Sequence, residues 1–325
     1  MGTFFTGSGS AAGTISGSLT RLVSEFEPMI RASRVGHRLG VAVPGQLAST
    51  KATFSYFLRN MFVDGSALNT GRRLIGQQVP TSEPGEWRTI SANLVDRGSQ
   101  SILDMADGYV LTDPESVAEM DELGTRLALD HTLDYVDGVA SYLLASAATP
   151  WSTADSAASA VWTTTGTDIL LDIATALDAH EAAVGERLPE GRLALSVGSK
   201  TYNGMKHNGS FTSLWGGASS LGGLTEEQLE AALKSIGIEK VYVGLDSRYG
   251  EYANLYVRPP GDELAATPNG RIMDSAGLIM PHSGDELIQV MEPMALDQRR
   301  YGYYAPANCD IVAIPEFGVR ITGTS

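Results

Sequence analysis

The stretch WTTTGTDILLDIATALDAHEAAVGERLPEGRLALSV, residues 162–197, determines how the rest of this chain is interpreted. Thr167 or Asp168 can cap a helix in which apolar residues recur at the spacing of one buried face, and Gly185 ends that helix. A Pro-Glu-Gly turn then leads into a mostly apolar strand from Arg192 to Val197. The stretch therefore predicts a helix, a turn and a buried strand that pack as one αβ unit. The apolar residues assigned to the buried face of the helix are Leu170, Ile173, Leu177 and Val184.

The composition is that of a folded protein with a strong acidic bias. Of the 325 residues, 43% are hydrophobic and 19% charged, which is ordinary for one large or two connected domains. The net charge of -15 argues against a protein that grips nucleic acid through clustered Lys and Arg. Cys309 is the only cysteine, so one chain can form neither a disulfide nor a cysteine metal cluster. Because neither a signal peptide nor a membrane-spanning segment is recognised, we expect the protein to be made and used in a cytoplasm.

The N-terminal region, residues 1–62, reads as an arm and a lead-in to the body. Residues 1–18 are rich in Gly, Ser and Thr, and residues 19–32 carry an apolar helical stripe that includes Phe26. Such a helix on a flexible tether cannot bury its stripe by itself, so we expect it to pack on the body or on a neighbour. Short strands or coil are expected between Val35 and Phe62.

The next region, residues 63–103, is predicted to form an extended loop. It is dense in turn-forming residues and contains two expected strands, Leu74–Val79 and Trp87–Val95, around a Pro-containing turn. A two-stranded arm of this kind is marginal in isolation. Its presence therefore indicates a cover from outside the monomer.

Later segments predict one long helix and a second, smaller αβ unit. Thr112 or Asp113 caps a helix that runs to about Ser146, with Pro in its first turn. A Gly-rich loop is expected from Gly198 onward, followed by a capped helix over Thr225–Ser235 and a strand. The C-terminal strands are expected at Leu255–Val257, Gly277–Met280, Leu287–Met291 and Cys309–Ile314, with a last strand from Gly318 that returns to an earlier sheet.

Three phrases, in this order, resemble tailed-bacteriophage major capsid proteins of the HK97-like fold, in the lambda-type branch. They are the lead-in Gly-Tyr-Val-Leu-Thr-Asp-Pro from Gly108, the stretch quoted first, and Gly-Ile-Glu-Lys-Val-Tyr-Val-Gly from Gly237. The resemblance covers about residues 60–320 and implies an α+β fold with an N-terminal arm, an extended β-hairpin loop, a peripheral domain with a long spine helix, and an axial α/β domain. The implied divisions are 1–62 for the arm, 63–103 for the loop, 104–165 for the peripheral domain, 166–285 for the axial domain and 286–325 for return strands.

Catalytic motifs are weak in this sequence. In Gly198-Ser-Lys200-Thr201 a serine separates the glycine from the lysine, so the spacing of a phosphate-binding loop is not met. The five histidines show no paired spacing for a metal, and His131 and His180 are expected at a helix surface or core edge. We therefore predict no catalytic, cofactor-binding or metal-binding residue, and no enzyme.

The resemblance implies a protein that assembles with itself, as pentamers and hexamers of an icosahedral shell around double-stranded DNA. Separate scaffolding, portal and decoration proteins are the further partners it suggests; DNA would be held without sequence-specific binding, no membrane would be involved, and the location would be the virion, after assembly in the host cytoplasm. Some capsids of this fold are welded through a loop lysine, but residues 63–103 contain none, so non-covalent contacts are expected. The candidates for contacts between subunits are Arg72, Arg73, Arg88, Arg97, Trp87 and Phe26.

Two other functions stay open at this point. A cellular nanocompartment would use the same kind of shell around a protein cargo. A soluble α/β enzyme without a recognisable motif would use the predicted loop as a lid and would form a small oligomer.

Overall fold

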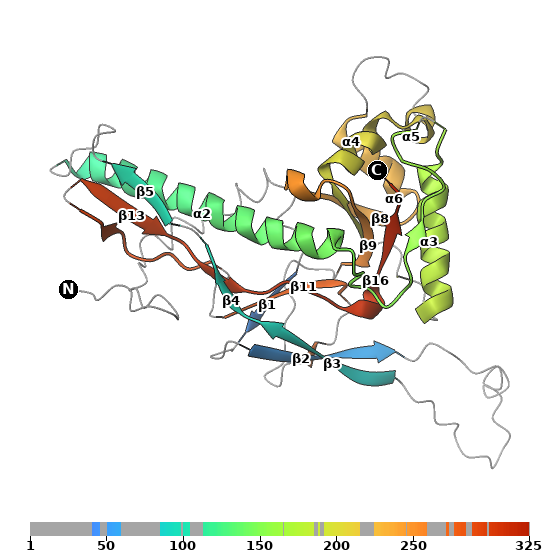
Figure 1. Cartoon of the computed structure of the whole chain (residues 1–325), viewed down its shortest axis with the longest axis horizontal. Helices are drawn as coiled ribbons and strands as arrows, with labels where there is room; N and C mark the ends of the chain where they lie inside the picture. The colour runs from blue at the N-terminus through green and yellow to red at the C-terminus, as the bar shows by residue number, and fades with distance from the viewer. Residues whose placement is uncertain are drawn as a thin grey trace, which may run out of the picture.

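A computed structural model shows an elongated α+β molecule with helices and strands at both ends (Figure 1). The predicted arm helix at 19–32 and the predicted strand at 74–79 lie outside the residues that the structure describes. Those residues are 41–45, 51–59, 85–98, 100–104, 113–164, 166–184, 188, 192–214, 224–244, 246–258, 271–272, 276–283, 288–297 and 299–324.

The long helix α2, Pro114–Ala145, is the element that connects the two ends of the molecule (Figure 1). It begins where the sequence predicts, because the Asp113 side chain accepts a hydrogen bond from the Glu115 amide at 3.3 Å and Pro fills the first helical position. At its other end, the Asn254 amide donates to the Leu144 carbonyl at 3.1 Å, and the Arg320 guanidinium donates to the Ser146 carbonyl. The prediction of one long helix is confirmed, and its C-terminus is fixed by residues more than a hundred positions away in the sequence.

One end of the molecule, which we call the axial lobe, is a five-stranded sheet with helices around it. The strand order is β6-β16-β9-β7-β8, and every residue of β7 and β9 is buried, as expected for a sheet covered on both faces. β16 comes from the end of the chain and pairs antiparallel with β9, so the predicted return strand is confirmed. The bounds are β6 Ser156–Ala157, α3 Ile169–Val184, β7 Leu193–Gly198, α4 Ser199–His207, α5 Gly209–Leu214, α6 Glu226–Lys234, β8 Ile238–Gly244, the 3-10 turn η4 Ser247–Tyr249, β9 Ala253–Val257 and β16 Gly318–Thr322.

The other end, the peripheral lobe, packs two small sheets against α2. β13 pairs with β5 and β12 in one sheet, and β11 pairs with β1, β14 and β15 in the other. Gly124 permits the close approach of α2 to this lobe, because a Cβ there would lie 2.2 Å from the Tyr303 ring. The bounds are β1 Val41–Gly45, β4 Val95–Arg97, β5 Gln100–Asp104, β11 Leu278–Ser283, β12 Met294–Ala295, β13 Arg300–Tyr304, β14 Ala307–Cys309 and β15 Val312–Ala313.

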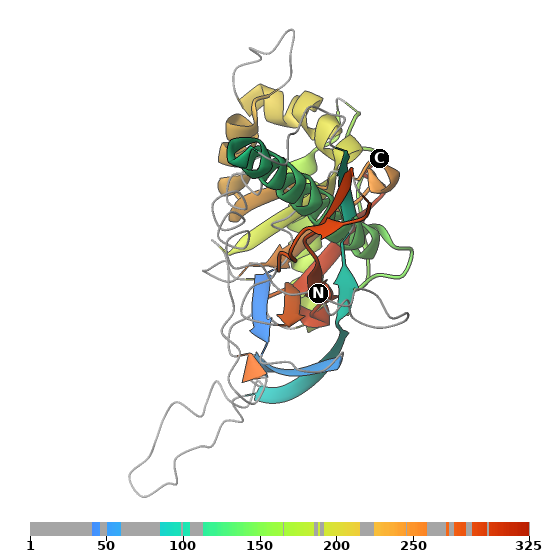
Figure 2. The same cartoon turned by 90° about the vertical axis from the view of Figure 1, so that its left-hand side faces the viewer.

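A third unit, which we call the stem hairpin, consists of β2, Lys51–Arg59, and β3, Gly85–Asn93. The two strands pair antiparallel over nine registered positions, and β10, Arg271–Ile272, pairs with the other edge of β2. Figure 2 shows the pair below the body formed by the other elements. The sequence correctly places a strand at Trp87 but does not predict β2, from the region assigned to the lead-in, as its partner. The partner that it does predict, Leu74–Val79, lies outside the described residues. The alternation of Phe54 and Tyr56 with polar residues in β2 matches the one-sided burial of β3.

The buried face of α3 differs from the predicted one at two residues. α3 spans the predicted range, but Leu170 and Val184 are only half-buried, and the buried face instead includes Asp172 and His180. Asp172 can lie on the buried face because its carboxylate accepts hydrogen bonds from the Trp162 indole at 3.0 Å and from the Ser159 amide at 2.9 Å. These bonds turn α3 toward the connector that precedes it and bury a carboxylate whose partners are provided.

The predicted Gly-rich loop after β7 is wrong as far as residue 214, because α4 and α5 occupy it. Gly204 lies inside α4, where a Cβ would come within 2.8 Å of the Thr163 side chain, so this glycine permits close packing rather than a turn. The other two helices of this region, α3 and α6, follow the prediction, and a full capping box between Thr225 and Gln228 begins α6.

Two predicted C-terminal strands are also modified. The segment 288–291 carries an isolated bridge between Ile288 and Ala307 instead of a strand. The strand expected at Cys309–Ile314 is divided into β14 and β15. Asp310 interrupts the strand, because its side chain accepts a hydrogen bond from the Ile311 amide at 2.9 Å, in place of a bond from that amide to a neighbouring strand.

Candidate functional site

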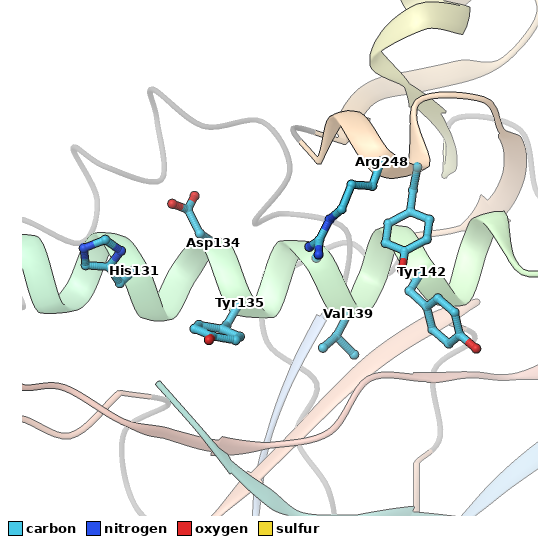
Figure 3. A pocket seen from close by; sticks show the side chains of 8 residues that line it. His131, Asp134, Tyr135, Val139, Tyr142 and Arg248 are labelled. Carbon is cyan, nitrogen blue, oxygen red and sulfur yellow. The ribbon is translucent and has the colours of Figure 1, made fainter. Parts of the chain in front are cut away.

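A groove on the solvent side of α2 is a hollow of about 460 Å³ at the point where η4 approaches the helix. Figure 3 shows Tyr135 and Tyr142, one heptad apart, projecting from α2, with Arg248 reaching toward the helix from η4. Both tyrosines are more than half exposed, at 56% and 58%. We call this the α2 groove; its lining residues are His131, Asp134, Tyr135, Gly138, Val139, Tyr142, Arg248 and Tyr249.

The wall of the α2 groove is held together by an ion pair at the start of η4 and by an aromatic contact between η4 and α2. The Arg248 guanidinium donates to both Asp246 carboxylate oxygens, with a shortest distance of 2.6 Å, and holds the pKa of that carboxyl below its usual range. The rings of Tyr142 and Tyr249 meet edge to face with centroids 5.5 Å apart. These contacts give the α2 groove an ordered aromatic wall with a paired arginine.

The α2 groove offers polar and aromatic side chains that are open to solvent. His131 and Asp134 lie one turn apart on α2, and both are exposed to solvent. In the described part of the chain, no three His, Cys, Asp or Glu side chains are grouped so that they could hold a metal ion. Tyrosine rings at an open surface suit the contact of another macromolecule.

A second cluster, which the sequence did not indicate, joins the stem hairpin to the axial lobe at Glu316. This residue lies in the 3-10 turn η5, Pro315–Phe317, and its carboxylate accepts from the Tyr56 hydroxyl at 2.7 Å and from the Arg88 guanidinium. The buried His180 ring nitrogen Nε2 lies 2.8 Å from the Glu316 carbonyl oxygen. His180 is buried; of the two places that the prediction left open for it, a helix surface or a core edge, the surface is wrong. The one sequence signal for the cluster is a glutamate within the otherwise apolar Ile-Pro-Glu-Phe.

The predicted contact residues fall into separate places. Trp87 and Arg88 are neighbours on β3 that face opposite sides of the stem hairpin: Trp87 is 40% exposed, whereas Arg88 turns toward Glu316. Arg97 lies apart from them on β4, where it donates to Asp310 at 3.4 Å and to the Cys309 carbonyl at 3.2 Å. Both arginines therefore have oxygen partners within their own chain. Arg72, Arg73 and Phe26 lie outside the described residues.

The other chemically notable residues have structural places. Lys200 lies in α4 and pairs with Glu251 at 2.7 Å. Cys309 is fully buried on β14, and burial raises the pKa of its thiol to about 11. Among the described residues, no helix is both long and apolar enough to cross a membrane.

Comparisons with known proteins identify the fold. No family model matches the chain, and no curated protein matches it. Among solved structures, a phage-related protein from Bordetella bronchiseptica RB50 is 15% identical, with a TM-score of 0.61 over 96% of this chain and 98% of its own. A virus-like particle from Pyrococcus furiosus is 10% identical, with a TM-score of 0.52 over 94% of this chain and 100% of its own. The mature capsid of bacteriophage PhiM1 is also 10% identical, with a TM-score of 0.45 over 99% of this chain and 91% of its own. The chain therefore has the α+β HK97-like capsid fold that the sequence predicts, with α2 as its long helix.

Proposed function

We propose that this chain is a major capsid protein of a tailed bacteriophage, in the lambda-type branch, whose copies form the pentamers and hexamers of an icosahedral shell. The observation that carries the proposal is the match of fold over 96% of this chain to a phage-related protein, at a TM-score of 0.61. A match over nearly the whole of both chains includes the lobes, α2 and the order of elements, and does not depend on one shared motif. Function would reside in repeated contacts and not in an active site.

The shape of the molecule supports lateral contact between copies. The stem hairpin buries one face against the axial lobe and exposes the other, which includes Trp87, Thr89 and Ser91. We propose that the segment between β2 and β3 is the extended loop that overlaps a neighbour, with Trp87, Arg72 and Arg73 on its contact surface. Phe26 would make an arm contact, whereas Arg88 and Arg97 would act by fixing β3 and β4 within the chain.

Charge supports a wall that contains DNA without binding it. The net charge of -15 disfavours contact with phosphates, so packaged double-stranded DNA would not be trapped on the inner surface. The segment 60–84, between the stem strands, also contains no lysine, which supports non-covalent joining of subunits. Scaffolding, portal and decoration proteins would be separate chains, and the mature location would be the virion.

The proposal is tested by expressing the full chain alone and comparing size-exclusion chromatography with negative-stain electron microscopy. Closed shells, tubes, or rings of five and six subunits are the expected result, and single-chain bands should remain after denaturation. A uniform dimer or tetramer, under each assembly condition and also with a scaffolding protein co-expressed, would overturn it. That outcome would favour the enzyme, with substrate binding then sought at the α2 groove.

The second candidate is a nanocompartment shell with a protein cargo. It is favoured by the TM-score of 0.52 to a structure described as a virus-like particle, over 94% of this chain. The two candidates differ in what is enclosed. Nuclease-resistant DNA inside particles from the native source supports the virion, and a single co-purifying protein inside DNA-free particles supports the compartment.

A further inference from the structure

The stem hairpin is joined to the body through one face. Phe54, Tyr56 and Ala92 lie in the same buried cluster as the strands of the axial lobe. Tyr56 also meets the Phe317 ring edge to face, with centroids 6.2 Å apart. The apolar contacts hold the hairpin against the lobe, but they are non-directional and do not by themselves fix its angle.

Directional contacts come from Glu316, whose side chain is only 7% exposed. It accepts one hydrogen bond from each strand of the stem hairpin, from Tyr56 on β2 and from Arg88 on β3. Bonds to a carboxylate are the stronger kind in proteins, and a buried carboxylate that loses its donors is costly. The Tyr56 bond is buried, whereas the Arg88 side chain is 45% exposed, so the Tyr56 bond is expected to be the more costly of the two to lose.

The turn that carries Glu316 is itself fixed to the body. The Ile314 amide donates to the Gly277 carbonyl at 2.8 Å, and the Ser152 amide donates to the Pro315 carbonyl at 2.8 Å. On the axial side, His180 Nε2 contacts the Glu316 carbonyl. A side chain on so well anchored a turn can transmit its position to both strands.

We propose that Glu316, with Tyr56 and Arg88, forms a latch that sets the direction in which the segment between β2 and β3 leaves the body. The inference rests on the proposed function, in which that segment overlaps a neighbouring subunit. Glu316 would thus be a positioning residue for a contact that it does not itself touch.

A second attachment at the far end of β3 limits the motion to one end. The Asn93 amide donates to the Asp310 carboxylate at 2.8 Å, and Arg97 also donates to Asp310. With β4 paired to β14 as well, the chain beyond Asn93 remains on the peripheral lobe when the latch opens. Opening would therefore swing the hairpin about its Asn93 end.

The test compares the full-length variants Glu316→Gln and Glu251→Gln. Glu251 is a matched control, because it is also a carboxylate paired with a cation but lies on the exposed surface. In unassembled subunits, Glu316→Gln should accelerate amide hydrogen exchange in 51–59 and 85–93 by about tenfold or more, while β7 and β9 stay protected. Particles assembled from this variant should show a wider size distribution than those from wild type or the control.

Wild-type exchange in both stem strands, together with a wild-type particle size distribution, would overturn the latch. If Glu316→Gln fails to fold, Tyr56→Phe decides, because it removes one bond and keeps the ring: local acceleration supports the latch, and unchanged exchange overturns it. If the wild type forms no particles under any condition, the proposed function fails, and the exchange experiment still decides whether Glu316 holds the stem hairpin.

Discussion

The axial sheet and the stem hairpin share one buried cluster but differ in how they are covered. Every residue of β7 is buried, whereas β3 buries Ala92 and exposes its neighbours Ser91 and Asn93. A strand covered on both faces gains stability from its own chain, while a strand covered on one face keeps a surface for another. The comparison teaches that this chain separates the part that makes it fold from the part that would make it assemble.

Two tryptophans, one buried in the axial lobe and one on the stem hairpin, should respond very differently to substitution by alanine. Trp162 is fully buried, and its indole donates to the buried Asp172 at 3.0 Å, whereas Trp87 on the stem hairpin is 40% exposed. Trp162→Ala should lower the free energy of unfolding by about 3–5 kcal/mol, because it leaves a cavity and removes the donor to one oxygen of the buried Asp172 carboxylate. Trp87→Ala should cost less than about 1 kcal/mol but reduce assembly. Urea denaturation of unassembled subunits and particle yield measure the two quantities.

Equal destabilisation by the two tryptophan substitutions would contradict the separation of the folding core from the assembly surface. It would mean that the stem hairpin contributes to the folding core as strongly as the axial sheet does. Normal particle yield from Trp87→Ala would separately remove this residue from the contact surface.

On the peripheral lobe, the buried Cys309 should make the stability of the chain depend on pH. Burial raises the pKa of its thiol from the usual 9.0 to about 11, so the folded state holds the proton more tightly than the unfolded state. Stability from this residue is therefore complete below pH 9 and is lost as the pH rises through 11, by roughly 2–3 kcal/mol in total. Urea denaturation at intervals from pH 8 to pH 11 measures this loss.

Cys309→Ala is the control for the alkaline loss, since the other titrating groups remain in the variant. The cavity left by Cys309→Ala should offset the two curves by a constant amount at lower pH. The size of this offset should change only above pH 9, the usual thiol value. Parallel curves for wild type and Cys309→Ala would show that the thiol does not report on the packing of the peripheral lobe.

The sequence predicted best where local signals and burial agree. The cap at Asp113 and the capping box at Thr225 begin helices that the structure contains, and the apolar strand after Arg192 is the fully buried β7. These elements have apolar periods and end signals that need no knowledge of distant residues.

The sequence failed where a partner lies far away in the chain. The Tyr56 and Glu316 side chains meet across 260 positions, and the one local signal, a glutamate among apolar residues, does not indicate Tyr56 as its partner. The partner of β3 was missed for the same reason, since β2 and β3 are separated by a long segment whose length hides their pairing. The place of His180 was left open because its burial depends on η5, which follows it by more than a hundred residues.

The smallest effect concerns two glycines on the same helix that face different surroundings. A Cβ at Gly124 would lie 2.2 Å from the Tyr303 ring, inside the packed peripheral lobe. At Gly138, beside the α2 groove, the nearest atom would be an Asp246 carboxylate oxygen at 3.3 Å, which a small movement can relieve. Gly124→Ala should therefore destabilise by about 1–3 kcal/mol through overpacking. Gly138→Ala should stabilise by up to about 1 kcal/mol, because alanine favours the helix. Thermal unfolding of both variants measures the sign of each change in stability.

A loss of stability in both variants would show that the groove side of α2 is packed as tightly as its buried side. The α2 groove would then be unsuited to receive another macromolecule.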